Sequence, residues 1–173
     1  MRGFGCLAVV ILLALFVVAI ATAGAPSPFA GKFELVPLFA KGHVPVISNG
    51  HQLYAERNTI SFRTAAGDTV TAFAGSTTDL ASIPAAAWPM LPPDGPYAEA
   101  TALHDPCYET SGTFDWKGPT GIIHHGRTRA APYSRAECDE ILDDAMVALH
   151  VPAWKRIVVY EAVRFGGASG WGR

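Results

Sequence analysis

Apolar residues are concentrated in one uninterrupted run near the start of the chain. From Cys6 to Ala23 the sequence CLAVVILLALFVVAIATA contains no charged residue, and Arg2 precedes it. A basic residue, an apolar stretch and small residues up to Ala25 are typical of a secretory signal peptide that is removed by cleavage. We therefore predict a signal peptide over residues 1–25. The alternative is an uncleaved membrane anchor, because about 18 apolar residues are long enough to cross a bilayer.

The pattern changes to short apolar stretches broken by turn residues between positions 26 and 95. Residues 26–49 contain four prolines and no helical period, which predicts an extended leader with a short strand near Lys32 to Val36. Residues 51–75 alternate β-favouring and polar positions around the turn sequence Ala-Ala-Gly-Asp and predict a small antiparallel hairpin or meander. Residues 75–95 contain four more prolines and are predicted to be a loop.

A helical period appears only in the second half of the chain. The stretch PYAEATALHDPCYE, residues 96–109, predicts a helix that begins with proline at its first position. The polar and glycine-rich residues 110–133 follow as a predicted connection.

Two further helices are predicted after this connection. Ser134 with Glu137 three residues later forms a capping box, and it precedes an apolar stripe at helical spacing up to position 150. A third helix is predicted for residues 152–165, ended by the following pair of glycines. The expected fold class is α+β: a small N-terminal antiparallel hairpin or meander, a loop, and a three-helix core within one globular domain, residues 50–173.

Charge and length narrow the class of protein. The 173 residues carry a formal net charge of −2, which becomes −3 if residues 1–25 are removed, because Arg2 is the only charged residue among them. Such a balance offers no positive field for nucleic acid, so we expect no nucleic-acid partner. The remaining length suits a single domain with its own core.

Only two cysteines, Cys107 and Cys138, would remain after cleavage. An even pair in an exported protein suggests one disulfide bond, and two buried free thiols are the alternative.

Side chains that could act in catalysis or bind a metal are most concentrated in the sequence ALHDPCYE, residues 102–109. On a helix His104 and Tyr108 share a face, whereas Asp105 is rotated by about 100° from His104. His104 and Asp105 are therefore expected to have separate roles in two adjacent parts of a site, and not to form a hydrogen bond with each other. We expect His104 to act as a base on water and Asp105 to bind a hard cation such as calcium.

A histidine base works better when a carboxylate holds its other nitrogen. Asp139 is the candidate, because it directly follows Cys138. A disulfide from Cys138 to Cys107 would place the two helices about 5 to 6 Å apart at the bridge and bring His104 close to Asp139.

These residues resemble two known families. His104-Asp105-x-Cys107-Tyr108 with a later Cys138-Asp139 pair is similar to the two-helix core of secreted phospholipase A2. The blocks TTDLASIPAAAW, HDPCY, SRAECDEILDDAM and YEAVRFGG, in that order over about residues 50–167, resemble a bacterial and phage family called domain of unknown function 1353.

The phospholipase resemblance implies an activity and a set of roles. His104 would be the general base, Asp139 its orienting partner, and Tyr108 a hydrogen-bond donor to Asp139. Asp105, the Asp79 side chain and the Leu80 carbonyl would bind calcium. The expected protein is a secreted or periplasmic calcium-dependent hydrolase acting on phospholipid esters at a membrane surface, or the same enzyme held on the outside by an uncleaved anchor.

Two departures from the phospholipase pattern keep other functions open. Pro106 is expected to kink or end the helix, since an interior proline costs about 3 kcal/mol. The glycine-rich calcium loop is replaced by TDLASIP. The alternatives are a non-catalytic, phage-derived envelope or virion module on the same scaffold, and a zinc-dependent cell-wall hydrolase, for which the chain lacks an HExxH motif.

Overall fold

The computed structural model describes residues 27–48, 50–80 and 89–172, and the predicted signal peptide lies outside these ranges. The described residues form several small antiparallel sheets and three α-helices, which confirms the predicted α+β class. Within them, no helix combines the length and the apolar character needed to cross a membrane.

Short strands make up the first half of the fold. Two three-stranded sheets have the orders β1-β8-β9 and β10-β7-β2, and both are antiparallel. Their strands are β1 (Phe29–Ala30), β2 (Leu35–Pro37), β7 (Tyr54–Glu56), β8 (Ile60–Arg63), β9 (Thr69–Ala72) and β10 (Thr77–Thr78). Two small hairpins extend from the second sheet, formed by β3 (Phe39–Ala40) with β4 (Val44–Pro45) and by β5 (Ile47–Ser48) with β6 (His51–Gln52).

The strand pairing changes two sequence predictions. In the predicted leader, the short strand expected near Lys32 to Val36 overlaps β2. The leader is nevertheless part of the sheets, because β2 pairs with β7 and β1 pairs with β8. The region predicted as a loop contains β10, which pairs with β7. Strands β1, β2 and β10 have two or three residues each, so their pairing is not visible as an alternating pattern in the sequence.

The connection between the first two helices also contains a hairpin that the sequence analysis did not predict. β11 (Asp115–Lys117) and β12 (Ile123–His125) pair antiparallel, and an isolated bridge joins Arg127 to Val70 of β9. The polar composition of this segment hid the strands, because backbone hydrogen bonds hold them while most of their side chains are solvent-exposed.

The helices agree closely with the predicted ranges. They are α2 (Ala98–Glu109), α3 (Arg135–Ala148) and α4 (Ala153–Gly166), with a 3₁₀ turn, η2 (Gly167–Gly170), after α4. The capping box is confirmed: the Ser134 hydroxyl accepts from the Glu137 backbone N–H, and the Glu137 carboxylate accepts from the Ser134 N–H.

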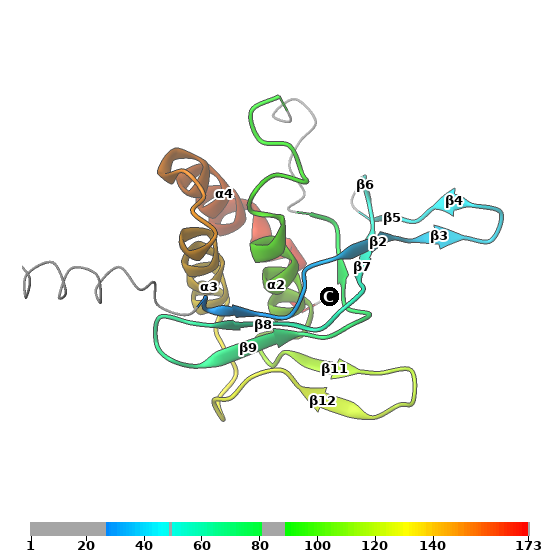
Figure 1. Ribbon diagram of the computed structural model, residues 1–173, viewed down its shortest axis with the longest axis horizontal. Coiled ribbons are helices and arrows are strands. Elements are labelled where there is room, and N and C mark those ends of the chain that lie inside the picture. The colour runs from blue at the N-terminus through cyan, green and yellow to red at the C-terminus, as the bar shows by residue number, and fades with distance from the viewer. Residues whose placement is uncertain (1–26, 49, 81–88, 173) are drawn as a thin grey trace, which may run out of the picture.

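Helix α2 is the centre of the domain. Figure 1 shows it between α3 on one side and the β7–β10 strands on the other, above the sheet of β8 and β9. One apolar core joins these elements, and its fully buried members include Ile60, Phe62, Val70, Leu103, Leu142 and Met146. The central position explains why α2 can bring side chains from several elements to one place.

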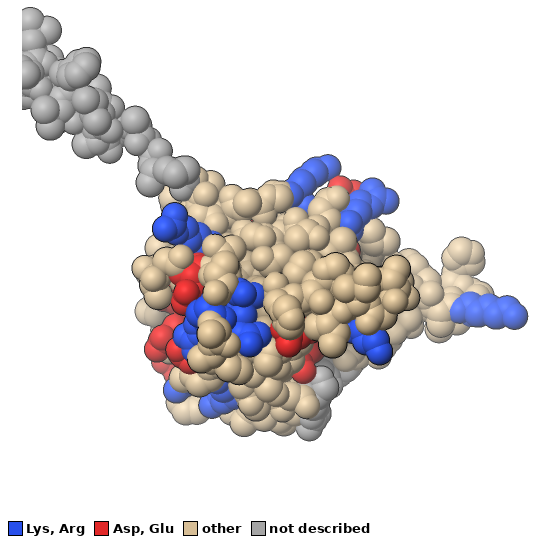
Figure 2. Space-filling model, turned by 90° about the horizontal axis from the view of Figure 1, so that it is seen from below, with Lys and Arg blue, Asp and Glu red and all other residues tan. Residues whose placement is uncertain are grey.

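Two parts of the described surface are conspicuously apolar. The β3–β4 hairpin projects from the body in Figure 1 and exposes Phe39 and Val44. Helix α4 exposes Trp154, Ile157 and Phe165, while its one buried residue is Val159. Figure 2 shows Lys and Arg side chains beside Asp and Glu side chains on one face, most of which is formed by other residues.

Candidate functional site

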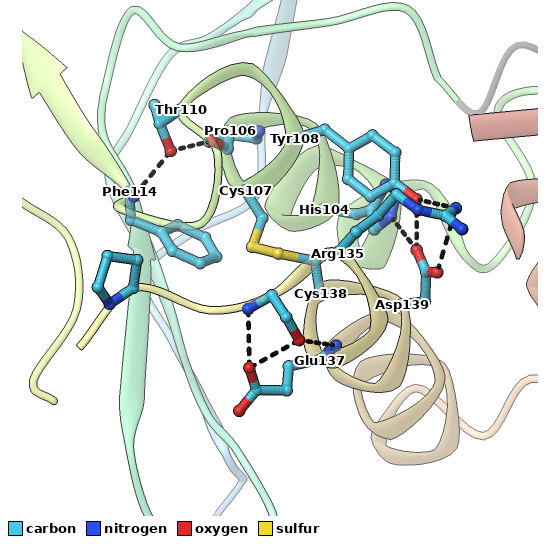
Figure 3. The surroundings of a disulfide bond; sticks show 12 residues. His104, Pro106, Cys107, Tyr108, Thr110, Phe114, Arg135, Glu137, Cys138 and Asp139 are labelled. Atoms are coloured by element: carbon cyan, nitrogen blue, oxygen red, sulfur yellow. Dashed lines mark hydrogen bonds and ion pairs between the residues drawn. A yellow bond between two sulfur atoms is a disulfide. The ribbon is translucent and has the colours of Figure 1, made fainter. Parts of the chain in front are cut away.

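A disulfide bond joins the two helices that carry the predicted site. Cys107 of α2 and Cys138 of α3 are bonded, with their Cα atoms 6.0 Å apart, and both residues are fully buried. The predicted pairing is confirmed, and the alternative of two free thiols is wrong. Cys107 is about one helical turn after His104, and Cys138 directly precedes Asp139 (Figure 3). The bridge therefore fixes the distance between the two helices close to both residues.

Helix α2 does not end at Pro106, contrary to one expectation, but continues to Glu109. The Pro106 ring is buried, and its carbonyl accepts from both the backbone N–H and the hydroxyl of Thr110. Proline has no backbone N–H, so the helix loses one hydrogen bond at this position. The burial of the ring, the two bonds from Thr110 and the neighbouring disulfide offset the cost of that loss. The last turn of α2, which carries Tyr108, is therefore kept.

The structure brings His104, Tyr108 and Asp139 into direct contact. His104 Nε2 lies 3.2 Å from Asp139 Oδ1, and the Tyr108 hydroxyl donates to the same oxygen at 2.6 Å. The two rings are 4.2 Å apart between centroids, as expected for neighbours one helical turn apart. Asp139 has no exposed surface and His104 is 5% exposed. This is the arrangement in which a carboxylate fixes the orientation of an imidazole.

Two arginines, which the sequence analysis did not select, complete the surroundings of Asp139. Arg164 Nη1 of α4 donates to Asp139 Oδ2 at 3.0 Å, and Arg135 Nη1 of α3 lies 3.8 Å from the same oxygen. Arg135 is one helical turn before Asp139, so its proximity was readable from the spacing. Arg164 is 25 residues away in the chain, and no local pattern indicated it.

Asp105 lies closer to His104 than the helical geometry predicted. Its Oδ1 is 3.7 Å from His104 Nδ1, and its Oδ2 accepts from the Thr78 hydroxyl of β10 at 2.5 Å. The two side chains lie at ion-pair distance, but no hydrogen bond between them is shown, as expected for neighbours rotated by about 100°. The hydrogen bond from Thr78 draws the Asp105 carboxylate toward β10 and along the edge of the imidazole.

The contacts of His104 and Asp139 act on their pKa values in opposite directions. Burial lowers the pKa of His104, but the carboxylates of Asp105 and Asp139 outweigh burial and raise it above its ordinary value. Burial raises the pKa of Asp139, but the hydrogen bonds from His104, Tyr108 and Arg164 outweigh it, so the Asp139 pKa is lowered. Asp139 is accordingly an ionised carboxylate in a fully buried place.

An open pocket of about 550 Å³ gives access to this cluster. Helix α2 contributes its polar wall, formed by Thr101, His104, Asp105, Tyr108 and Glu109. The opposite wall is formed by small residues between positions 162 and 170, at the end of α4 and in η2. A side chain added at Gly167 would come within 2.8 Å of the Tyr108 ring, so glycine there permits close packing of the two walls.

The predicted cation ligands are only partly gathered at the pocket. Asp79 and Asp105 both line it, and so does Glu109, which the sequence analysis did not select. Leu80 is buried, has a left-handed backbone (φ 58°) and does not line the pocket. Among the described residues, no group of three or more His, Cys, Asp or Glu side chains is arranged to hold a metal ion.

A buried acid lies beside the site on β7. Glu56 is 3% exposed, and neither of its carboxylate oxygens has a hydrogen-bond partner among the described residues. Its backbone N–H bonds to Ser76, two residues before the Thr78 that holds Asp105. Burial, followed by the negative charges of Glu99 and Asp105, raises the pKa of Glu56 to about 8.

This raised pKa predicts that stability decreases as the pH rises. The folded chain keeps the Glu56 proton up to about pH 8, whereas the unfolded chain releases it near the ordinary value of 4.5. The contribution is complete below pH 4.5 and is lost as pH rises through 8, by about 5 kcal/mol in all. Glu56→Gln is therefore expected to match the wild type near pH 5 and to be more stable at pH 9.

Urea unfolding at the two pH values measures this difference. Glu161→Gln, at an exposed position of α4, is the matched control and should follow the wild-type curve at both. A Glu56→Gln protein that loses as much stability as the wild type between pH 5 and pH 9 would contradict the assignment.

Comparison with known proteins adds one finding. A family model described as "Protein of unknown function (DUF1353)" matches residues 57–163, more than half of the chain. Neither the curated proteins nor the solved structures include a match. The matched range contains both disulfide-bonded cysteines, His104, Tyr108 and Asp139, and it ends one residue before Arg164.

Proposed function

Because this chain belongs to the DUF1353 family, whose description assigns no activity, we propose a function from the site itself: an exported, calcium-dependent hydrolase that activates water with a His-Asp dyad. Phospholipid esters are the proposed substrates, after the resemblance of the HDxCY and CD residues to secreted phospholipase A2. One observation carries the proposal: His104 bonds the buried Asp139 through Nε2, and the same histidine lines an open pocket.

The dyad would work by general-base catalysis. With Nε2–H donating to Asp139, the unprotonated Nδ1 of His104 takes a proton from water while the water oxygen attacks the ester carbonyl carbon. The carboxylates of Asp139 and Asp105 stabilise the imidazolium that forms. When the carbon–oxygen bond to the leaving alcohol breaks, His104 returns the proton to the leaving oxygen.

The pocket has donor chemistry that suits a hard cation. Asp79 and Asp105, with Glu109 beside them, line the pocket with carboxylates, the ligand type that calcium prefers. The Leu80 carbonyl, expected from the sequence as a further ligand, does not belong to this lining. Bound calcium would polarise the ester carbonyl and stabilise the oxyanion.

Export and lipid contact are supported by separate features. Disulfide bonds persist in oxidising compartments, and the chain has one between α2 and α3. Two exposed apolar side chains are sequence neighbours of lining residues: Ile47 precedes Ser48, and Phe165 precedes Gly166. Exposed apolar residues of this kind suit contact with a membrane surface.

The direct experiment measures fatty acid released from vesicles of phosphatidylcholine and phosphatidylglycerol by the purified protein, with calcium or with EDTA. We expect release that depends on calcium. His104→Gln should lower the rate by about 10²- to 10⁴-fold, the usual contribution of a general base. His124→Gln, on the exposed β12 strand, is the matched control and should keep the wild-type rate.

Two outcomes would reject parts of the proposal. Folded protein that releases no fatty acid with any divalent metal rules out the hydrolase. Release that survives in His104→Gln keeps the hydrolase but removes the dyad.

A non-catalytic, phage-derived envelope or virion module is the second candidate. Its motivation is the departure from the phospholipase pattern, with Pro106 inside α2 and TDLASIP in place of a glycine-rich calcium loop. Calorimetry with calcium separates the two, because such a module should show neither heat of binding nor a higher Tm.

A further inference from the structure

Helices α3 and α4 hold each other by two reciprocal arginine contacts at the pocket. Arg164 of α4 donates to the Asp139 carboxylate of α3 at 3.0 Å. In return, Arg135 of α3 donates to the backbone carbonyl of Arg164 at 3.1 Å and to that of Val163 at 3.4 Å. We call this pair of contacts the arginine clasp.

The electrostatics of Asp139 require a contact of this kind. A fully buried carboxylate is strongly destabilised unless positive charge and hydrogen bonds compensate it. His104 and Tyr108 are directed at Oδ1, but when His104 is the neutral base, the imidazole and the phenol bring hydrogen bonds and no net charge. Positive charge comes to Oδ2 from Arg164 and, at 3.8 Å, from Arg135.

The same clasp controls where the small-residue wall lies. Arg135 bonds the backbone carbonyls of Val163 and Arg164. Val163 itself lines the pocket, and so do Gly166 and Gly167 shortly after Arg164 in the chain. Gly167 also packs against the Tyr108 ring, whose hydroxyl bonds Asp139. A shift of this wall would therefore be transmitted to Asp139 by two routes, through Arg164 and through Tyr108.

We propose that Arg164 is a positioning residue, which holds the Asp139 carboxylate in register with His104 and ties it to the pocket wall formed by α4 and η2. The groups around the dyad are Asp105 and Tyr108 from α2, Arg135 from α3 and Arg164 from α4, with Tyr160 of α4 near Arg164. Arg164 is the one among them that joins Asp139 to α4. The kinetic test of this inference rests on the proposed function, but its spectroscopic test does not.

The kinetic test compares Arg164→Gln with Arg164→Lys. We expect Arg164→Gln to lower kcat by about 100-fold, the effect of misplacing a catalytic group by about 1 Å, with little change in KM. Arg164→Lys keeps the charge and should recover most of kcat. Arg156→Gln is the matched control, because Arg156 bonds Asp143 across the same two helices at 2.8 Å but away from the pocket.

The spectroscopic test observes the ring nitrogens of His104 by NMR in protein labelled with ¹⁵N-histidine. Wild type, Arg164→Lys and Arg156→Gln are expected to show a strongly hydrogen-bonded Nε2–H, shifted downfield. Arg164→Gln should move this signal upfield, since the carboxylate is then free to rotate toward Arg135.

The two tests separate the possible failures. If no variant or wild type hydrolyses ester but the NMR signal moves as expected, the positioning role stands and the proposed function fails. If Arg164→Gln leaves both kcat and the signal as in Arg156→Gln, the positioning role is overturned. Should Arg164→Gln not fold, Arg164→Met, which also removes the charge, is measured in its place. A lower kcat and an upfield shift of the signal support the role, and wild-type values of both overturn it.

Discussion

Asp139→Ala is expected to lower the free energy of unfolding by about 3 to 5 kcal/mol, the usual cost of breaking a buried charge network by removing one partner. The substitution leaves the buried Tyr108 hydroxyl and the His104 Nε2 without their acceptor. It also leaves Arg164 without the carboxylate that it bonds. Each of these groups loses a charge-assisted hydrogen bond at the fully buried position of Asp139, where water does not readily take the place of the carboxylate.

Denaturant unfolding at neutral pH checks this value, and two variants calibrate it. Asp139→Asn keeps the shape and an acceptor oxygen but loses the charge, so we expect a smaller loss of about 1 to 3 kcal/mol. Asp143→Ala removes the partly exposed pair with Arg156 on the same helix and should cost at most about 1 kcal/mol. Equal losses for Asp139→Ala and Asp143→Ala would show that the buried network contributes little.

Removing the disulfide is the second large effect. Cys107 and Cys138 are 31 residues apart, and closing a loop of this size stabilises a fold by about 3 to 4 kcal/mol in the chain-entropy model. The double variant Cys107→Ala, Cys138→Ala should lose this amount, measured by denaturant unfolding in a Cys6→Ala background that prevents mispairing.

Reduction of the parent protein provides the comparison. With a reducing agent, the Cys6→Ala parent should shift to the midpoint of the double variant, and the double variant itself should not respond. An unfolding midpoint that is the same with and without the reductant would contradict the prediction. Since α2 and α3 also pack through the apolar core, we expect the reduced fold to persist at low denaturant.

The helices and the central pairing of the site were largely predictable from the sequence. The capping box at Ser134 and the proline at position 96 marked helix starts to within two residues. Cys107 and Cys138 lie close to His104 and Asp139 in the sequence. The expected disulfide was therefore enough to predict that His104 and Asp139 are in contact. Such local and covalent signals are strong because they act over one helical turn or one bond.

Other parts were not predictable, because they depend on contacts distant in the sequence. The β11–β12 hairpin has a polar, exposed pattern, so its strands resemble a loop. The position of Asp105 depends on Thr78, 27 residues earlier, and the charge balance of Asp139 depends on Arg164, 25 residues later. Helical geometry alone places a side chain on a face but does not say which distant group will attract it.

Helix α4 differs from the other two helices in how it is anchored. It has no covalent link to α2 or α3, and Val159 is the one residue that it buries. Local openings of low free energy occur where little apolar surface is buried. Amide hydrogen exchange should therefore be faster in α4 than in the bridged pair α2 and α3, so the pocket would widen by breathing of this one wall while the histidine stays in place.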